Sequence, residues 1–290
     1  MPIPSPVIEP PWNGTRPPVS VVILTLDEEA NLPGCLDSCA WCDDVHVLDS
    51  GSRDRTAAIA RERGVGLHVH PFESFGSQRN WAIDHVPTRH GWVFHLDADE
   101  RFTPGLVEEM GRVVSSGPAE AGFYVANQMV FMGRWIKRAA GYPAYQMRLF
   151  HTGRMRFIDH GHGQRESPGT VIGRLKNPYV HLNFSKGLED WIARHNRYST
   201  AEAAQIVRDG GVGGVGLGGL FSGDSTVRRR ALKGFAAGLP MRPQLRWLYT
   251  VVAQGAFLDG RAGLTYAGLV SMYERMIQLK VRAMRAERSG

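Results

Sequence analysis

Apolar, largely β-branched runs alternate with amphipathic stretches over the first hundred residues. The run VSVVILTL at 19–26 is uninterrupted, as is typical of a strand buried on both faces of a parallel sheet. Shorter runs within 44–52, 65–71 and 91–100 predict three further strands. Helical periodicity lies between them. This order predicts an α/β, Rossmann-like fold whose mostly parallel sheet is flanked by helices.

The pattern changes after residue 105. A helical stretch at 106–114 precedes an aromatic, alternating region at 122–167, which predicts strands that add an edge to the sheet. An amphipathic helix is predicted over 186–209, and glycines crowd 210–219. From Val227 the chain is helical in pattern, basic and apolar. We therefore predict a flexible proline-rich arm (1–18), an α/β domain (19–208), a glycine-rich linker (209–226) and a basic amphipathic helical tail (227–290).

Composition narrows the possible partners and the compartment. The 290 residues carry a net charge of +6 and a pI near 9.4, which favours nucleotides, nucleic acid or an anionic membrane surface. The three cysteines lie within eight residues, which indicates a reducing compartment rather than a disulfide framework. The N-terminus has no signal-peptide pattern. The uncharged apolar stretch 247–258 falls short of the ~20 residues that span a bilayer, so we expect a cytoplasmic protein.

Three carboxylates, Asp97, Asp99 and Glu100, follow the fourth predicted strand. Residues two apart in an extended segment point the same way, so Asp97 and Asp99 are predicted to face one site. Such oxygen ligands suit Mg²⁺ or Mn²⁺ bound to a diphosphate. Ligands of parallel sheets bind beyond the carboxyl ends of the strands, which adds Thr25 and Asp49 as candidates. The alternative is that Asp97 or Asp99 only caps the next helix.

Four motifs, in this order, resemble inverting family 2 glycosyltransferases. VSVVILTLDEEANLPGCLDS, VHVLDSGSRDRT, GSQRNWAI and WVFHLDADE are similar to the family's first strand, second strand and turn, R-N-x-A helix and D-x-D strand. YQMRLF, GRLKNPYVHLNF and WIARHNRYST resemble the subgroup that builds lipopolysaccharide cores and exopolysaccharides. This resemblance spans about 19–200. It implies a GT-A catalytic domain over 19–208, a nucleotide-sugar donor and a glycan or lipid-linked acceptor.

The resemblance also implies a role for each matched residue. Thr25 would lie beside the nucleotide, and Asp49 would accept a hydrogen bond from the base, expected to be uracil. Arg79 would neutralise the diphosphate, Asp97 would reach the ribose or the metal, and Asp99 would ligate Mg²⁺ or Mn²⁺. Two alternatives stay open: Asp49 stabilises its own turn, and Arg79 is a solvated surface arginine.

Inverting transfer needs a general base that removes the proton of the acceptor hydroxyl. The segment FIDHGHGQRES offers two carboxylates, Asp159 and Glu166. We prefer Glu166, which lies in a loop rich in glycine and histidine. The alternative is that Glu166 pairs on the surface with Arg165 or another basic residue.

Three local matches point to other chemistry. The spacing of Cys35, Cys39 and Cys42 is that of an iron–sulfur site in radical enzymes, although the same spacing places small apolar residues on one buried helix face. GVGGVG at 211–216 matches a dinucleotide fingerprint without the preceding strand, so we interpret it as a linker. The histidines that could suggest zinc offer no clear third ligand; they are His160, His162 and His181.

The tail at 227–290 supports two interpretations. Its cationic and apolar segments are typical of amphipathic helices that lie on a membrane surface, and a lipid-linked acceptor would make this useful. Alternatively it forms a helical hairpin that packs on the catalytic domain or on a second copy of the chain. Nucleic-acid binding is not predicted, because no recognised module is present. A non-catalytic scaffold with the same fold is the competing class, and Arg79, Asp97 and Asp99 argue against it.

Overall fold

The computed structural model describes residues 6–9, 11, 13–160, 163–208 and 241–289. The chain divides into two compact units, Met1–Lys186 and Gly187–Gly290. The predicted α/β domain extended to residue 208, but helix α5 (Gly187–Arg208) groups with the second unit because it packs along α8 (Gly260–Ser289). The expected linker at 209–226 and the start of the tail lie outside the described residues.

Strand and helix alternate from β1 to β4, over the first hundred residues, as the sequence predicts. The order begins β1 (Val19–Thr25), α1 (Leu32–Ser38), β2 (Val45–Asp49), α2 (Thr56–Glu62), β3 (Gly66–Val69), α3 (Phe75–His85), β4 (Trp92–Asp97), β5 (Glu100–Arg101) and α4 (Pro104–Ser115). It continues with β6 (Gly122–Phe131), β7 (Arg134–Trp135), β8 (Ala144–His151), β9 (Phe157–His160), β10 (Gly163–Glu166), β11 (Ile172–Arg174) and β12 (Tyr179–His181).

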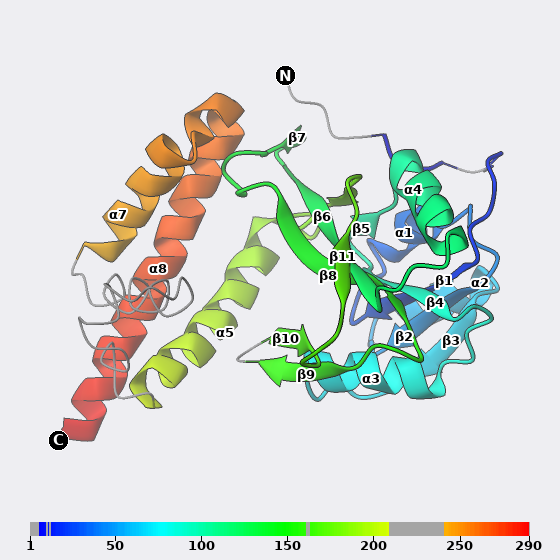
Figure 1. Cartoon of the computed structure of the whole chain (residues 1–290). Helices are drawn as coiled ribbons and strands as arrows, with labels where there is room; N and C mark the ends of the chain where they lie inside the picture. The colour runs from blue at the N-terminus through cyan, green and yellow to red at the C-terminus, as the bar shows by residue number, and fades with distance from the viewer. Residues whose placement is uncertain (1–5, 10, 12, 161–162, 209–240, 290) are drawn as a thin grey trace. The chain divides into compact units, whose positions relative to one another are not determined.

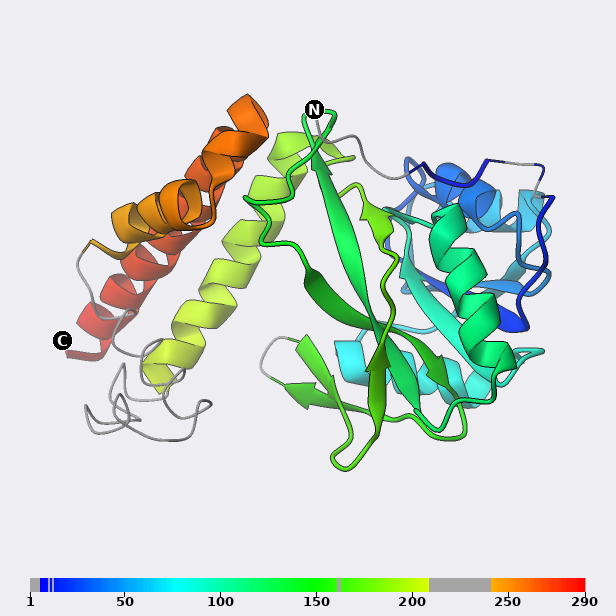
Figure 2. The same ribbon diagram turned by 45° about the horizontal axis from the view of Figure 1, so that its top comes forward.

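The main sheet has the strand order β3-β2-β1-β4-β8-β6-β12-β5. Its first four strands run parallel, and β8 then pairs antiparallel with β4 and β6. The long strand β6 lies between β8 and β12 (Figure 2). The aromatic region after α4 therefore extends the sheet, as predicted, and the α/β class is confirmed.

Helices cover both faces of the parallel part of the sheet (Figure 1). Val21 and Ile23 of β1 pack in a core with residues of α1, α2 and α4. Val22 and Leu24 point the other way and pack in a second core with α3. Both sets are apolar because the strand is covered on each side, which explains the unbroken run in the sequence.

The N-terminal arm is not loose throughout, contrary to prediction. Ile8 is 3% exposed and belongs to the larger core, and its backbone N–H donates to the carbonyl of Phe102 at 3.1 Å. Pro17 is also buried. An apolar side chain within the proline-rich segment thus docks part of it on the α/β unit.

A two-stranded hairpin, β9–β10, stands apart from the main sheet. It packs against α3, and the side chain of Asn80 holds it by donating to the carbonyl of Phe157 and accepting from the N–H of Phe157. The hairpin therefore forms a wall beside the carboxyl end of β4.

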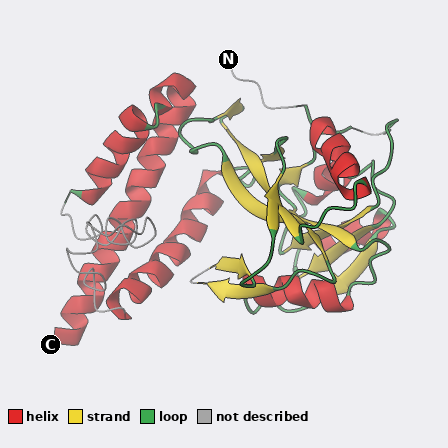
Figure 3. Ribbon diagram, in the orientation of Figure 1, coloured by secondary structure: helices red, strands yellow, loops and turns green. Residues whose placement is uncertain are grey.

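The described part of the second unit is helical (Figure 3). It comprises α5, α7 (Arg242–Leu248), the short turns η2 (Tyr249–Ala253) and η3 (Ala256–Asp259), and α8. The predicted C-terminal helical extension is therefore present over 241–289. Among the described residues, every helix is too short or too polar to cross a bilayer.

Candidate functional site

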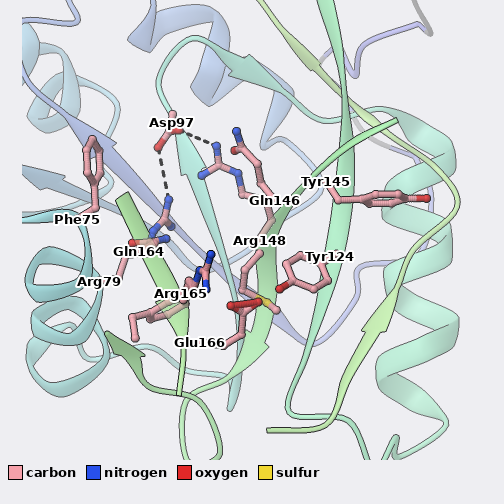
Figure 4. A pocket seen from close by; sticks show the side chains of 12 residues that line it. Phe75, Arg79, Asp97, Tyr124, Tyr145, Gln146, Arg148, Gln164, Arg165 and Glu166 are labelled. Atoms are coloured by element: carbon pink, nitrogen blue, oxygen red, sulfur yellow. Dashed lines mark hydrogen bonds and ion pairs between the residues drawn. The ribbon is translucent and has the colours of Figure 1, made fainter. Parts of the chain in front are cut away.

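A cavity of about 370 Å³ opens between the carboxyl end of β4, the start of α3, strand β8 and the β9–β10 hairpin. Figure 4 shows the charged side chains on its walls. The lining combines aromatic rings with polar groups: Phe75, Arg79, Asp97, Tyr124, Tyr145, Gln146, Met147, Arg148, Phe157, Gln164, Arg165 and Glu166. Three predicted site residues, Arg79, Asp97 and Glu166, therefore meet in one cavity.

Asp97 is bound to two arginines. Its Oδ2 lies 2.6 Å from Nη2 of Arg148, and its Oδ1 lies 3.9 Å from Nη2 of Arg79 (Figure 4). Arg148 also pairs at 2.5 Å with Glu100, whose side chain is fully buried. The positive charge that separates the clustered carboxylates is thus, in this structure, supplied by arginine.

Burial and charge set the protonation of this group. The surrounding protein alone would raise the pKa of Asp97, but Arg148 and Arg79 outweigh it and lower that pKa to about 2. Burial, and then the charge of Arg148, lower the pKa of Arg79 to about 10. At neutral pH Asp97 is therefore an anion and Arg79 a cation.

Arg79 is not the surface arginine of the alternative interpretation. It is 5% exposed, and its Nε and Nη1 atoms are shielded from solvent without a hydrogen-bond partner. Unsatisfied buried donors are rare in folded proteins, and here they belong to a cation that lines a cavity. This arrangement suits an anionic ligand.

The prediction placed Asp97 and Asp99 two residues apart in one extended segment, and the structure contradicts this geometry. Strand β4 ends at Asp97, and Ala98 and Asp99 form a turn into β5. Glu100 holds this turn by accepting the N–H of Asp97 at 3.0 Å. The turn places Asp99 beside His181 of β12, with its Oδ2 3.2 Å from Nε2 of His181.

Asp99 and His181 lie close enough together to hold one divalent cation. Neighbouring ligands at about 2.1 Å from a small cation lie roughly 3 Å apart, close to the observed 3.2 Å. Burial would lower the pKa of His181, but Asp99 outweighs it and raises that pKa to about 8, so a bound cation would displace a proton. Within the described residues no cluster of three such ligands occurs; phosphate oxygens and water would complete the shell.

The two candidate bases have different surroundings. Asp159 accepts from the Ser74 hydroxyl at 2.8 Å and from the N–H of Gly76 at 3.0 Å, so it is engaged at the start of α3. Glu166 lines the cavity, and its Oε1 is shielded from solvent without a partner. In the described part of the chain, Glu166 forms no ion pair with Arg165. The geometry thus favours Glu166 as the reactive carboxylate.

Asp49 and Thr25 hold a turn at the ends of β2 and β1. Asp49 is 2% exposed and accepts from the hydroxyls of Thr25 and Ser52 and from the N–H groups of Gly51 and Ser52. These contacts support the turn-stabilising alternative. Neither residue lines the cavity, and their contacts with a nucleotide stay predictions.

The cysteines take part in the core. Cys35 and Cys39 are buried free thiols in the larger core, and Cys42 packs against it. Burial raises the pKa of Cys42 to about 12, so this sulfur is a neutral thiol at pH 7, whereas a metal ligand is a thiolate. His162 and the GVGGVG stretch lie outside the described residues.

Two residues of the site received no role from the sequence. In the sequence analysis, Arg148 is only one letter of the motif YQMRLF. A charged residue between apolar neighbours in a strand is itself a signal of a buried ion pair. Gln164 lines the cavity with its Oε1 unpartnered. His181 was considered only for zinc, because the pairing of β12 with β5 that brings it to Asp99 is a long-range contact.

Comparison with known proteins identifies the family. The profile described as Glycosyl transferase family 2 matches residues 20–174, more than half of the chain. The chain belongs to glycosyl transferase family 2. The match runs from the second residue of β1 to the end of β11. The predicted GT-A α/β fold and a glycosyltransferase activity that uses nucleotide sugars are thereby confirmed.

Two curated glycosyltransferases and one solved structure are similar to this family 2 glycosyltransferase. The lipopolysaccharide core biosynthesis glycosyltransferase LpsC of Rhizobium meliloti is 26% identical over 200 residues, which cover 67% of this chain and 73% of LpsC. An uncharacterized glycosyltransferase of Rickettsia bellii is 29% identical over 204 residues, 66% and 68% of the two chains. Glucosyl-3-phosphoglycerate synthase of Mycobacterium tuberculosis, solved with Mn²⁺ and UDP, has a TM-score of 0.43 and 17% identity over 71% and 88%.

Proposed function

We propose that this chain transfers a sugar from a nucleotide diphosphate, with UDP-sugars as the first candidates, to a hydroxyl of a glycan or lipid-linked saccharide with inversion. The main support for this proposal is the cavity at the carboxyl end of β4, which Arg79, Asp97 and Glu166 all line. It offers a cation for the departing diphosphate and an unpartnered carboxylate for the incoming hydroxyl.

Glu166 acts as the general base in this proposal. It takes the proton of the acceptor hydroxyl while the acceptor oxygen bonds to the anomeric carbon. The bond from that carbon to the diphosphate oxygen breaks, and the electron pair leaves with the diphosphate. General-base catalysis of this kind contributes roughly 10²–10⁴-fold in rate.

Arg79 and the Asp99–His181 pair serve the leaving group. The guanidinium of Arg79 offers its free Nε and Nη1 to phosphate oxygens. Asp99 and His181 would hold Mg²⁺ or Mn²⁺, which when bound supplies positive charge for the departing diphosphate. Asp97, fixed by Arg148, then faces the ribose or the sugar. Thr25 and Asp49 end the adjacent strands β1 and β2, and the base of the nucleotide would lie there.

The relatives support our proposal of a role in cell-envelope polysaccharide synthesis. LpsC carries a name from lipopolysaccharide core synthesis and aligns over two thirds of this chain. The sequence motifs resemble the same subgroup. We therefore propose a saccharide of the envelope as acceptor.

A donor screen tests the proposed activity. We expect one nucleotide sugar to raise the melting temperature in the presence of Mn²⁺, and the same compound to be turned over. EDTA should abolish turnover, and added Mn²⁺ or Mg²⁺ should restore it. Two protein ligands, Asp99 and His181, hold a cation weakly enough for a chelator to remove it. Donor binding without turnover on any acceptor would favour the non-catalytic scaffold, and turnover unaffected by EDTA would refute the metal.

The second unit presents an apolar, cationic surface that we propose contacts an anionic membrane. A group of its exposed apolar residues lies within 245–258: Leu245, Trp247, Leu248, Tyr249, Val252, Phe257 and Leu258. The exposed charges nearby are Arg246 and Arg261, whereas Asp259 is 2% exposed. Aromatic and aliphatic side chains beside cations suit the interface of anionic lipid.

Flotation with vesicles tests this contact. The chain should float with phosphatidylglycerol-containing vesicles, less with phosphatidylcholine alone, and a Trp247→Ser/Leu248→Ser variant should lose binding. Val171→Ser, which changes an exposed valine of the first unit, is the matched control. Absence of flotation together with concentration-dependent dimerisation would assign the surface to a second copy of the chain.

A further inference from the structure

Strand β10 presents two polar side chains to the cavity from alternate positions. Gln164 and Glu166 both line it, and the Oε1 atom of each is shielded from solvent without a hydrogen-bond partner (Figure 4). A shielded acceptor without a donor destabilises the folded protein. Two such oxygens on one strand indicate a ligand that brings hydroxyl donors.

The register of the hairpin confirms that both residues share a face. Glu166 lies opposite Phe157, which also lines the cavity, and Gln164 lies opposite Asp159. Arg165, between them, also lines the cavity, but it lies opposite Ile158, whose side chain is 45% exposed. Side chains at i and i+2 of a strand point the same way, with α-carbons about 6.8 Å apart. Hydroxyls of one sugar ring can reach both oxygens.

We propose that Gln164 and Glu166 form the acceptor subsite of the cavity, and that the acceptor is a saccharide ring with a second free hydroxyl beside the one that is glycosylated. This inference rests on the proposed function. Glu166 removes the proton of the attacking hydroxyl, whereas Gln164 Oε1 accepts a hydrogen bond from the second hydroxyl, which does not react. Gln164 is thus a positioning residue that selects acceptors carrying a diol.

The placement of the hairpin explains why this wall belongs to the acceptor. Arg79 and Asp97 come from α3 and β4, and they mark where the diphosphate leaves. Inversion requires the acceptor to attack from the side opposite the leaving group. The base stands on that side, and β10 carries the base. Gln164, the next residue on the same strand face, therefore contacts the molecule from which Glu166 takes a proton.

The test uses the full chain with Mn²⁺, the UDP-sugar that it turns over, and the alkyl hexopyranoside that it glycosylates. Gln164→Ala should raise the KM for the hexopyranoside about 10-fold, the effect of one hydrogen bond, and leave the KM for the donor and its hydrolysis without acceptor unchanged. Ile158→Thr, on the other face of the hairpin, should change neither. For one monodeoxy hexopyranoside, the KM of the wild type should rise by the same factor. With that compound, Gln164→Ala should raise the KM no further.

Two results would overturn the acceptor subsite. One is a raised donor KM or slower donor hydrolysis in Gln164→Ala, which would give the subsite to the donor sugar. The other is an unchanged acceptor KM in Gln164→Ala at an unchanged melting temperature. Failure of the proposed function is distinct, because the wild type itself would then turn over no nucleotide sugar.

Discussion

The two ends of the parallel sheet both carry buried polar clusters, yet only one is satisfied. At the amino end, Asp44 accepts from the hydroxyl of Ser20 at 2.5 Å and from the N–H of Arg89 at 2.6 Å, and it pairs with His46 at 3.1 Å. At the carboxyl end, the cavity holds Arg79 and Glu166, each with shielded atoms that have no partner.

The difference separates a stabilising cluster from a site. A buried polar group that is fully hydrogen-bonded holds the fold, and nothing is left to bind a ligand. A buried group with free atoms beside a cavity destabilises the empty protein and is satisfied when a ligand arrives. The same contrast divides Asp159, engaged at the start of α3, from Glu166, although the two are seven residues apart in the sequence.

Substitution of Arg79 should give the larger effect on catalysis. Arg79→Met removes this cation from the cavity, while Asp97 keeps its bond to Arg148, so the fold should persist. We expect kcat to fall about 10²-fold, the usual effect of removing one preorganised donor, with a higher KM for the donor. Steady-state kinetics check this.

Arg154→Met is the control for Arg79, because Arg154 is an exposed arginine that lies over the ring of Trp92 away from the cavity. If kcat fell equally in the two variants, or if Arg79→Met kept full activity, the cavity would not be distinguished from the rest of the surface.

Substitution of Asp44 should give a smaller effect, and one on stability. Asp44→Asn removes the negative charge beside His46 and leaves one amide oxygen, which can face either the shared donors Ser20 and Arg89 N–H or His46, but not both. It should lower the free energy of unfolding by about 1–3 kcal/mol. Activity of the folded enzyme should be unchanged. Urea denaturation and kinetics at pH 7 check both expectations.

The effect of Asp44→Asn should depend on pH. Burial alone would raise the pKa of Asp44, but the hydrogen bonds from Ser20 and Arg89 and the charge of His46 outweigh it and lower that pKa. The ionised carboxylate therefore stabilises the fold above its unfolded pKa of about 3.9. As pH falls below that value this stability is lost, and the variant should approach the wild type. A constant difference down to pH 3 would contradict the assignment.

The sequence predicted the parts of the molecule that depend on local pattern. The run at β1 is apolar from Val21 to Leu24, on alternate faces, because helices cover both faces, so the pattern predicted a buried parallel strand. The strand ends pointed to Asp97, and the family resemblance pointed to Arg79 in α3; the two residues do meet. Helix α5 was predicted within one residue at either end, since its amphipathic pattern is long.

What the sequence did not show depends on tertiary contacts. The turn at Ala98 and Asp99 is held by Glu100 and by Arg101, whose Nη1 donates to the carbonyl of Ala98 at 2.8 Å. Neither contact follows from an extended pattern. His181 reaches Asp99 only because β12 pairs with β5, 80 residues away in sequence. Likewise, the hairpin register that separates Asp159 from Glu166 could not be read from two carboxylates in one segment.

The central claim is that the cavity is where the sugar is transferred, with Glu166 as base. Its most direct test compares kcat for transfer by Glu166→Gln and Asp159→Asn under identical donor, acceptor and Mn²⁺ at a temperature where both are folded. The account predicts a loss of roughly 10²-fold or more for Glu166→Gln, and a change of no more than a few-fold for Asp159→Asn. Full activity of Glu166→Gln, or a larger loss in Asp159→Asn at equal folded fraction, would contradict it.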